Sequence, residues 1–175
     1  YTTSFIFTGL GVIVAFHAGL FNIGGEGQAQ MGGLGVALVC LALPWPHWTI
    51  ALLAASIGAA VFGAAWAAIP AYLQAKRGSH IVITTIMFNY IAAALIVYML
   101  VDVLRPAGQM DPASARFPKG ASLPALSDMP LLRGFFAKVN ADGTAKLNAA
   151  GEQLYSNVPA NVTLFIALAA CLVVW

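Results

Sequence analysis

The chain has 175 residues, of which 61% are hydrophobic and only 8% are charged. Because soluble domains carry about 25% charged residues, this composition excludes an ordinary water-soluble core and indicates a membrane protein. A formal net charge of +2, with no basic stripe in the sequence, also argues against nucleic acid as a partner.

The ionisable residues are distributed unevenly along the chain. Up to Val101 the sequence contains, besides three histidines, only Glu26, Lys76 and Arg77, whereas residues 102–157 contain five acids and six bases. This contrast predicts a single transmembrane domain over residues 1–175, with residues 102–157 as a polar loop within it. The chain begins without Met and stops inside an apolar run, so we expect it to be a fragment of a larger protein.

Five apolar stretches are predicted to be transmembrane helices, because backbone groups in hydrocarbon must be hydrogen-bonded internally. They cover residues 4–21, 27–43, 49–73 and 81–101, and the fifth begins near Val158. None of them alternates apolar and polar residues as the strands of a membrane barrel do. The predicted fold class is therefore all-α, a polytopic helical membrane protein with about five transmembrane helices.

The third stretch carries small residues at helical spacing, which are Ala55, Gly58, Ala59, Gly63 and Ala67. In lipid, such faces let helices approach closely, so this helix is predicted to pack tightly against a neighbour. Pro70 is expected to bend its final turn. Ser79 is expected to cap the start of the fourth stretch.

The first polar cluster within the membrane part reads FNIGGEGQAQMGGLG, residues 21–35. An ionisable group at membrane depth costs at least about 2.5 kcal/mol, so the default interpretation of Glu26 is functional. The glycines around it predict a helix break beside a transport path, with Asn22, Gln28 and Gln30 as partners of Glu26. The alternative is an interfacial turn in which Glu26 is solvated and stabilises the next helix through its dipole.

The second polar cluster reads SHIVITTIMFNYIA, residues 79–92. Thr85 and Asn89 are four residues apart and therefore share one face of the predicted helix. This polar stripe either lines the same path as Glu26 or bonds to neighbouring helices. The sequence has no nucleotide-binding loop, nucleophile elbow or metal-binding motif, so no catalytic residue, metal or cofactor is predicted in this chain.

The two clusters in this order resemble the permease subunits of bacterial ABC importers, in the branch that handles simple sugars and nucleosides. That branch is related to the branched-chain amino acid permeases. The first cluster matches the family's pattern from Phe21 to Ile23 and at Gly24, Glu26, Gly27 and Gln28, and the second follows it closely from Ile81 to Ala92. His80 stands where the family usually has Glu, so no role of that acid carries over.

The resemblance implies a multi-pass permease of the bacterial plasma (inner) membrane that is not itself an enzyme. Its implied partners are a second permease subunit, cytoplasmic ATP-binding subunits that hydrolyse ATP, and an extracytoplasmic solute-binding protein. It also implies that Lys76 and Arg77 are cytoplasmic and residues 102–157 extracytoplasmic. Both segments carry bases, but the positive-inside rule by itself favours the same orientation, because residues 102–157 are near the length at which charge stops controlling translocation. The expected solute is a nucleoside, then a simple sugar, then a branched-chain amino acid.

Two other functions fit the composition less well. A secondary transporter or channel without an ATPase partner would need intramembrane charge pairs for ion coupling, and only Glu26 is available. An intramembrane serine protease would need Ser and His on facing helices, but Ser79 and His80 are neighbours in sequence.

Overall fold

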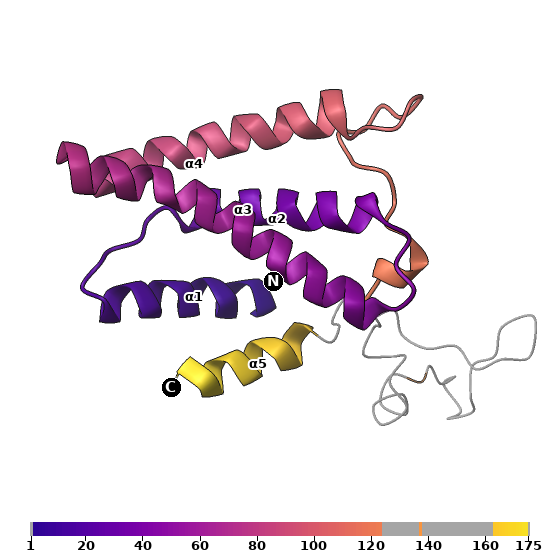
Figure 1. Cartoon of the computed structure of the whole chain (residues 1–175), viewed down its shortest axis with the longest axis horizontal. Coiled ribbons are helices and arrows are strands. Elements are labelled where there is room, and N and C mark those ends of the chain that lie inside the picture. The colour runs from indigo at the N-terminus through magenta and orange to yellow at the C-terminus, as the bar shows by residue number, and fades with distance from the viewer. Residues whose placement is uncertain (1, 124–136, 138–162, 175) are drawn as a thin grey trace, which may run out of the picture. The chain divides into compact units, whose positions relative to one another are not determined.

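The computed structural model describes residues 2–123, 137 and 163–174, and every element formed by these residues is helical, as predicted. The elements are α1 (Thr2–His17), α2 (Gly25–Ala42), α3 (Trp48–Arg77), α4 (Ile81–Tyr98), a π-helical turn (Met99–Val103), a 3₁₀ turn (Lys119–Ala121) and α5 (Thr163–Val174). Figure 1 shows them along the chain. The first four predicted helices are found within four residues of their expected bounds, while residues 158–162 of the fifth lie outside the described residues.

The chain divides into two compact units, residues 8–122 and residues 1–7 with 123–175. Helix α5 and the first residues of α1 belong to the second of these, and the helix packing and the site described below lie in the first. The predicted polar loop, residues 102–157, begins inside the π-helical turn that extends α4. Residues 124–136 and 138–157 of that loop lie outside the described residues.

Two helical segments have the length and apolar composition to cross a membrane, namely Trp48–Arg77 and Ile81–Val103. The segments Thr2–His17 and Thr163–Val174 are shorter apolar helices. The apolar composition of these four helical segments fits a helical membrane protein. The number of transmembrane helices, expected from the sequence to be about five, stays a prediction.

Helices α2 and α3 pack with their backbones almost in contact. A Cβ atom placed on Gly35 would lie 2.5 Å from the Gly58 carbonyl oxygen, and one placed on Gly32 would lie 3.4 Å from the Ala59 carbonyl oxygen. Near the start of α2, a Cβ on Gly63 would lie 3.4 Å from the Gln28 carbonyl oxygen. These pairs make the two helices antiparallel, and they confirm the prediction that the small residues of α3 mark a close helix contact.

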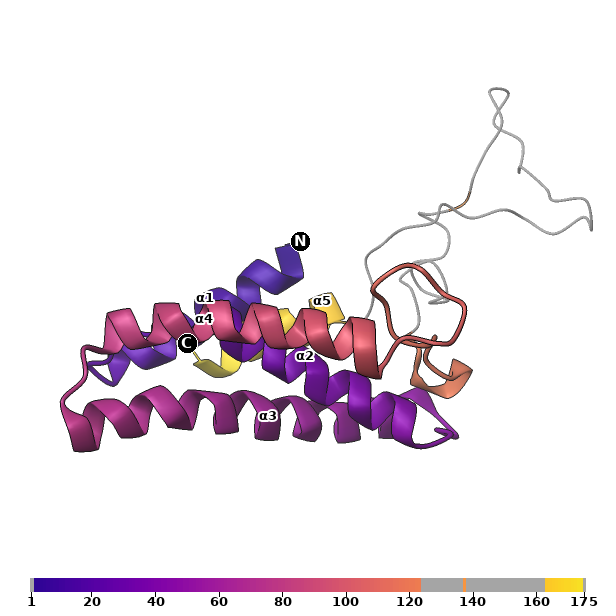
Figure 2. The same ribbon diagram turned by 90° about the horizontal axis from the view of Figure 1, so that it is seen from above.

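Helix α4 packs on another side of α2 and runs parallel to it, so that α2, α3 and α4 lie side by side (Figures 1 and 2). Met31 and Leu34 of α2 and Ala92 of α4 form the buried apolar cluster between these helices. Because α3 runs antiparallel to α2 and α4 runs parallel to it, three helix ends lie close together: the start of α2, the end of α3 and the start of α4. The polar residues of both sequence clusters gather there.

Glycines in the left-handed conformation end α1 and α3. Gly19 has a φ of 70°, and the following Leu20 N–H donates to the Ala15 carbonyl at 3.0 Å. Gly78 has a φ of 65°, and its N–H donates to the Gln74 carbonyl at 3.1 Å. Only glycine adopts this conformation without a steric cost, so these two residues fix where the helices stop.

Two local predictions about α3 and α4 need correction. The residue that caps α4 is His80, without a side-chain hydrogen bond, and the Ser79 hydroxyl is buried with no hydrogen-bond partner among the described residues. The expectation that Ser79 caps α4 was therefore wrong, because Ser79 is taken up in closing α3: its N–H donates to the Leu73 carbonyl at 3.4 Å. Pro70 lies inside α3 rather than in its final turn, because the helix continues to Arg77.

Candidate functional site

The residues predicted from the sequence to form a site gather around the start of α2. The non-helical break lies upstream of Glu26, over residues 18–24, and α2 begins at Gly25. Glu26 therefore sits in the first turn of α2, where a carboxylate interacts favourably with the helix dipole. The glycines beside it belong to this first turn and not to an irregular segment.

Asn22 and Gln28 hold the end of the break against α2. The Asn22 Nδ2 group donates to Gln28 Oε1 at 3.1 Å, and Gln28 Nε2 donates back to Asn22 Oδ1 at 3.4 Å. Asn22 Oδ1 also accepts a hydrogen bond from the Gly24 N–H at 2.9 Å. The two carboxamides are thus fixed by each other and by the backbone, while each keeps one N–H that the other does not use.

Asn89 of α4 caps the start of α2 from outside that helix. Its Oδ1 accepts from the Gly27 N–H at 2.9 Å, and its Nδ2 donates to the Ile23 carbonyl at 3.1 Å. The capping position of α2 is Gly24, which has no side chain to do this. Asn89 therefore makes the interhelical bonds that were one of the two interpretations of its sequence cluster.

Thr85 lies one turn before Asn89 on the same face of α4, as its spacing predicted. Its side chain is 3% exposed, and its hydroxyl donates to the Ile81 carbonyl at 2.8 Å, within its own helix. A Cβ placed on Gly24 would lie 3.3 Å from the Cβ of Thr85. The absence of a side chain at Gly24 thus lets the break approach α4 closely.

Glu26 and Gln30 form a separate pair on the outer side of α2. Gln30 Nε2 donates to Glu26 Oε1 at 3.5 Å, and Glu26 is exposed. The Gln30 Oε1 atom is buried without a hydrogen-bond partner in the part of the chain that the structure describes. Of the three partners expected for Glu26, the structure brings Gln30 to it and pairs Asn22 with Gln28 instead.

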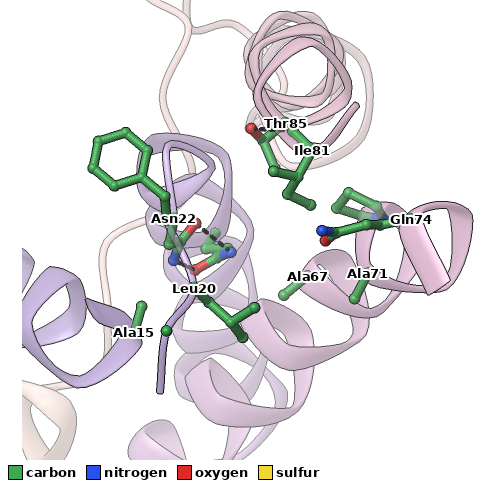
Figure 3. Close-up of a pocket in the computed structure, with 12 residues that line it drawn as sticks. Ala15, Leu20, Asn22, Ala67, Ala71, Gln74, Ile81 and Thr85 are labelled. Atoms are coloured by element: carbon green, nitrogen blue, oxygen red, sulfur yellow. Dashed lines mark hydrogen bonds between the residues drawn. The ribbon is translucent and has the colours of Figure 1, made fainter. Parts of the chain in front are cut away.

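Two cavities flank the start of α2. The first, which we call the amide cavity, has a volume of about 410 Å³ and includes Asn22, Gln28, Gln74 and Thr85 in its wall (Figure 3). The second, which we call the Glu26 cavity, has a volume of about 450 Å³. Its wall consists of Glu26 and four residues of α4, which are Ile86, Asn89, Tyr90 and Ala93. Five of the six sequence-predicted site residues therefore line one of two cavities, and Gln30 reaches the second through Glu26.

Gln74 was not predicted as a site residue, because the sequence places it just beyond the predicted helix over residues 49–73, in a short polar loop before the next one. In the structure Gln74 belongs to α3, and its side chain extends toward the space beside Ile81 and Thr85 of α4 (Figure 3). The signal in the sequence was the helical spacing of residues 67, 70, 71 and 74, which puts Gln74 on the same face as Pro70. Within the described residues, no group of three His, Cys, Asp or Glu side chains could hold a metal ion.

Residues 1–175 match the family described as "Branched-chain amino acid transport system / permease component". The glucose ABC transporter permease protein of Haloferax volcanii is 38% identical over 125 residues, which are 71% of this chain and 32% of that protein. No solved structure matches the chain.

Two bacterial relatives are similar at the same level. The guanosine ABC transporter permease protein of Bacillus subtilis is 44% identical over 102 residues, 58% of this chain and 29% of that protein. The nucleoside ABC transporter permease protein of Lactococcus lactis is 39% identical over 107 residues, 61% of this chain and 29% of that protein. The chain thus spans about a third of the length of these relatives.

Proposed function

Because the chain belongs to the family of permease components of branched-chain amino acid transport systems, we propose that it is part of the membrane-spanning permease of an ABC importer. The importer moves a small polar solute, a nucleoside or a simple sugar, into the cytoplasm. The observation that carries this proposal is the match of the family over residues 1–175. The relatives' names support the two solute classes, since one is a glucose permease and two are nucleoside permeases.

The proposed importer has further subunits. A second permease completes the membrane part, cytoplasmic ATP-binding subunits hydrolyse ATP, and an extracytoplasmic solute-binding protein delivers the solute. The permease spans the bacterial inner membrane several times, with Lys76 and Arg77 at the end of α3 on the cytoplasmic side, as the positive-inside rule favours for bases beside a short connection between two helices. The polar loop, residues 102–157, lies on the side of the binding protein.

The polar residues at the start of α2 are proposed to shape the solute path. Asn22, Gln28 and Thr85 line the amide cavity, and Glu26 and Asn89 line the Glu26 cavity. Gln30 acts on the second cavity by its hydrogen bond to Glu26. Neutral amides and hydroxyls in such walls bind the donors and acceptors of a polar solute without trapping it through charge.

ATP-dependent uptake by the full-length permease tests the function. We expect co-purification with an ATP-binding subunit, and uptake of guanosine or glucose into proteoliposomes only when ATP and the binding protein are present. Uptake that needs no ATPase and follows an ion gradient would instead establish the secondary transporter. Calorimetry on the binding protein with guanosine, glucose and leucine would then identify the solute class.

Glu26→Gln is expected to lower uptake about ten-fold, the factor that corresponds to ~1.4 kcal/mol, with the amount of permease in the membrane unchanged. The substitution keeps a hydrogen-bond acceptor for Gln30 and removes the charge that faces the cavity. Initial uptake rates normalised to permease content measure the effect. Asp111→Asn is the matched control, because Asp111 is an exposed acid outside the helices. Equal uptake by the wild type, Glu26→Gln and Glu26→Ala would leave Glu26 with its helix-dipole role alone.

A further inference from the structure

We infer that the amide cavity binds the transported solute at the end of the helices next to Lys76 and Arg77, and that Gln74 selects an uncharged solute with adjacent hydrogen-bond donor and acceptor groups. The inference rests on the proposed function and adds to it a site, a residue and a chemical requirement. The nearby Glu26 cavity is not the binding site in this assignment.

The size and wall of the amide cavity fit a small solute. Its volume of about 410 Å³ falls within the range of about 300–1,000 Å³ typical of ligand pockets. Two alanines of α3, Ala67 and Ala71, form an apolar part of the wall, and Leu20 adds to it from the break before α2 (Figure 3). Pro70 of α3 also lines the cavity. Small side chains at these positions leave the space open, and an apolar side accommodates the face of a ring.

The cavity wall carries no charge. Its polar side chains are three carboxamides, Asn22, Gln28 and Gln74, and the Thr85 hydroxyl, and none of the described residues that line it is ionisable. A solute with a carboxylate and an ammonium group would leave both charges without partners there, which is unfavourable. The wall therefore discriminates against amino acids, although the family's description names them.

Gln74 is the polar side chain of this wall whose donor and acceptor are both free to bind a solute. Asn22 and Gln28 hold each other, and the Thr85 hydroxyl is used within α4. The Gln74 carboxamide makes no hydrogen bond within the described residues, and it extends into the cavity from α3 (Figure 3). A carboxamide offers a donor and an acceptor side by side, which match a neighbouring donor and acceptor on a heterocycle or two hydroxyls of a sugar.

Solute protection of a cysteine in the cavity wall tests the inference. The full-length permease, with its native cysteines replaced, carries Ala71→Cys as the reporter, and Tyr72→Cys on the exposed side of α3 as the control. Guanosine, glucose and leucine are first assayed for ATP-dependent uptake. The transported solute is then added during labelling by a membrane-permeant maleimide. At about ten times its dissociation constant, the solute is expected to slow labelling of the Ala71→Cys variant about ten-fold and to leave that of the Tyr72→Cys variant unchanged.

A second substitution tests the role of Gln74. Combined with the Ala71→Cys reporter, Gln74→Leu keeps a side chain of similar size but removes its hydrogen-bonding groups. It is expected to abolish the protection by the solute while the reporter cysteine stays reactive. Gln74→Asn, which keeps a carboxamide, is expected to retain part of the protection. Ala67→Cys replaces the reporter if Ala71→Cys does not assemble. Five results would overturn the inference: an unreactive reporter, a reporter that the transported solute does not protect, equal protection of reporter and control, protection that survives Gln74→Leu, or leucine as the transported and protecting solute. ATP-dependent uptake without protection would leave the proposed function standing, whereas no ATP-dependent uptake of any solute would count against that function itself.

Discussion

Replacing Gly35 with alanine is expected to destabilise the permease more than any other single methyl group added to α2. The new Cβ would lie 2.5 Å from the Gly58 carbonyl oxygen and 3.0 Å from the Phe62 ring. The first of these atoms belongs to the backbone of α3, so a rotamer change cannot relieve the overlap and the two helices must separate. Overpacking of this kind costs ~1–3 kcal/mol, and the separation would also reach the buried cluster around Met31 and Leu34. Thermal unfolding of the purified permease in detergent, followed by size-exclusion chromatography, measures the loss.

The matched control for this prediction lies two residues away on the same helix. Gly33 is exposed, and a Cβ placed on it meets nothing within 4 Å. Gly33→Ala should therefore be neutral or slightly stabilising, because alanine favours helix over glycine by up to about 1 kcal/mol. Gly58→Ala should resemble Gly35→Ala, since its Cβ would lie 2.7 Å from Val39 Cγ2 and 3.0 Å from the Gly35 carbonyl oxygen. Similar melting temperatures for Gly33→Ala and Gly35→Ala would contradict the close contact of α2 and α3.

Asn89→Ala is expected to cause the second large loss, by separating the start of α2 from α4. The substitution leaves the Gly27 N–H and the Ile23 carbonyl without their partners. An unsatisfied buried polar group costs ~1–3 kcal/mol, and these groups are partly buried, so the lower half of that range applies to each. We expect a lower melting temperature and, because the break before α2 then loses its attachment, a loss of uptake larger than the loss of folded permease.

Two substitutions on α4 make this prediction specific. Asn89→Asp keeps an acceptor for the Gly27 N–H and loses the donor to Ile23, so it should retain about half of the stabilisation. Thr84→Val removes a hydroxyl that bonds only to the His80 carbonyl of its own helix, and it should change little. Equal effects of Asn89→Ala and Thr84→Val on melting temperature and uptake would show that the cap supplied by α4 is unimportant.

Most of the helical architecture could be predicted from the sequence. Apolar runs ended by polar or glycine-containing segments placed the starts of α3 and α4 within one residue, at Trp48 and Ile81. The small residues of α3 predicted a close contact, because small side chains on a helix in lipid let the backbone of a neighbouring helix approach closely. The same local reasoning failed at Ser79, where closing α3 and capping α4 compete for one residue.

The candidate site was predictable only in part. Asn22, Glu26, Thr85 and Asn89 stand out because polar side chains are costly within apolar stretches, whatever their neighbours. Their pairing did not follow from sequence, since Asn89 bonds to backbone groups 62 and 66 residues away. Gln74 was missed for a related reason: the basic residues after it mark a loop, and only the extension of α3 to Arg77 turns Gln74 toward a cavity.

The close approach of α2 and α3 has a mechanical consequence. Where two backbones meet without a layer of side chains between them, there is little free volume through which the helices could slide past each other. The hairpin of α2 and α3 is therefore stiff, and it transmits a displacement along its length as a lever does. Movement of one end of this hairpin, near Trp45 and Trp48, would be carried to Gln74 and Glu26 at the other end, so that both cavities change shape together.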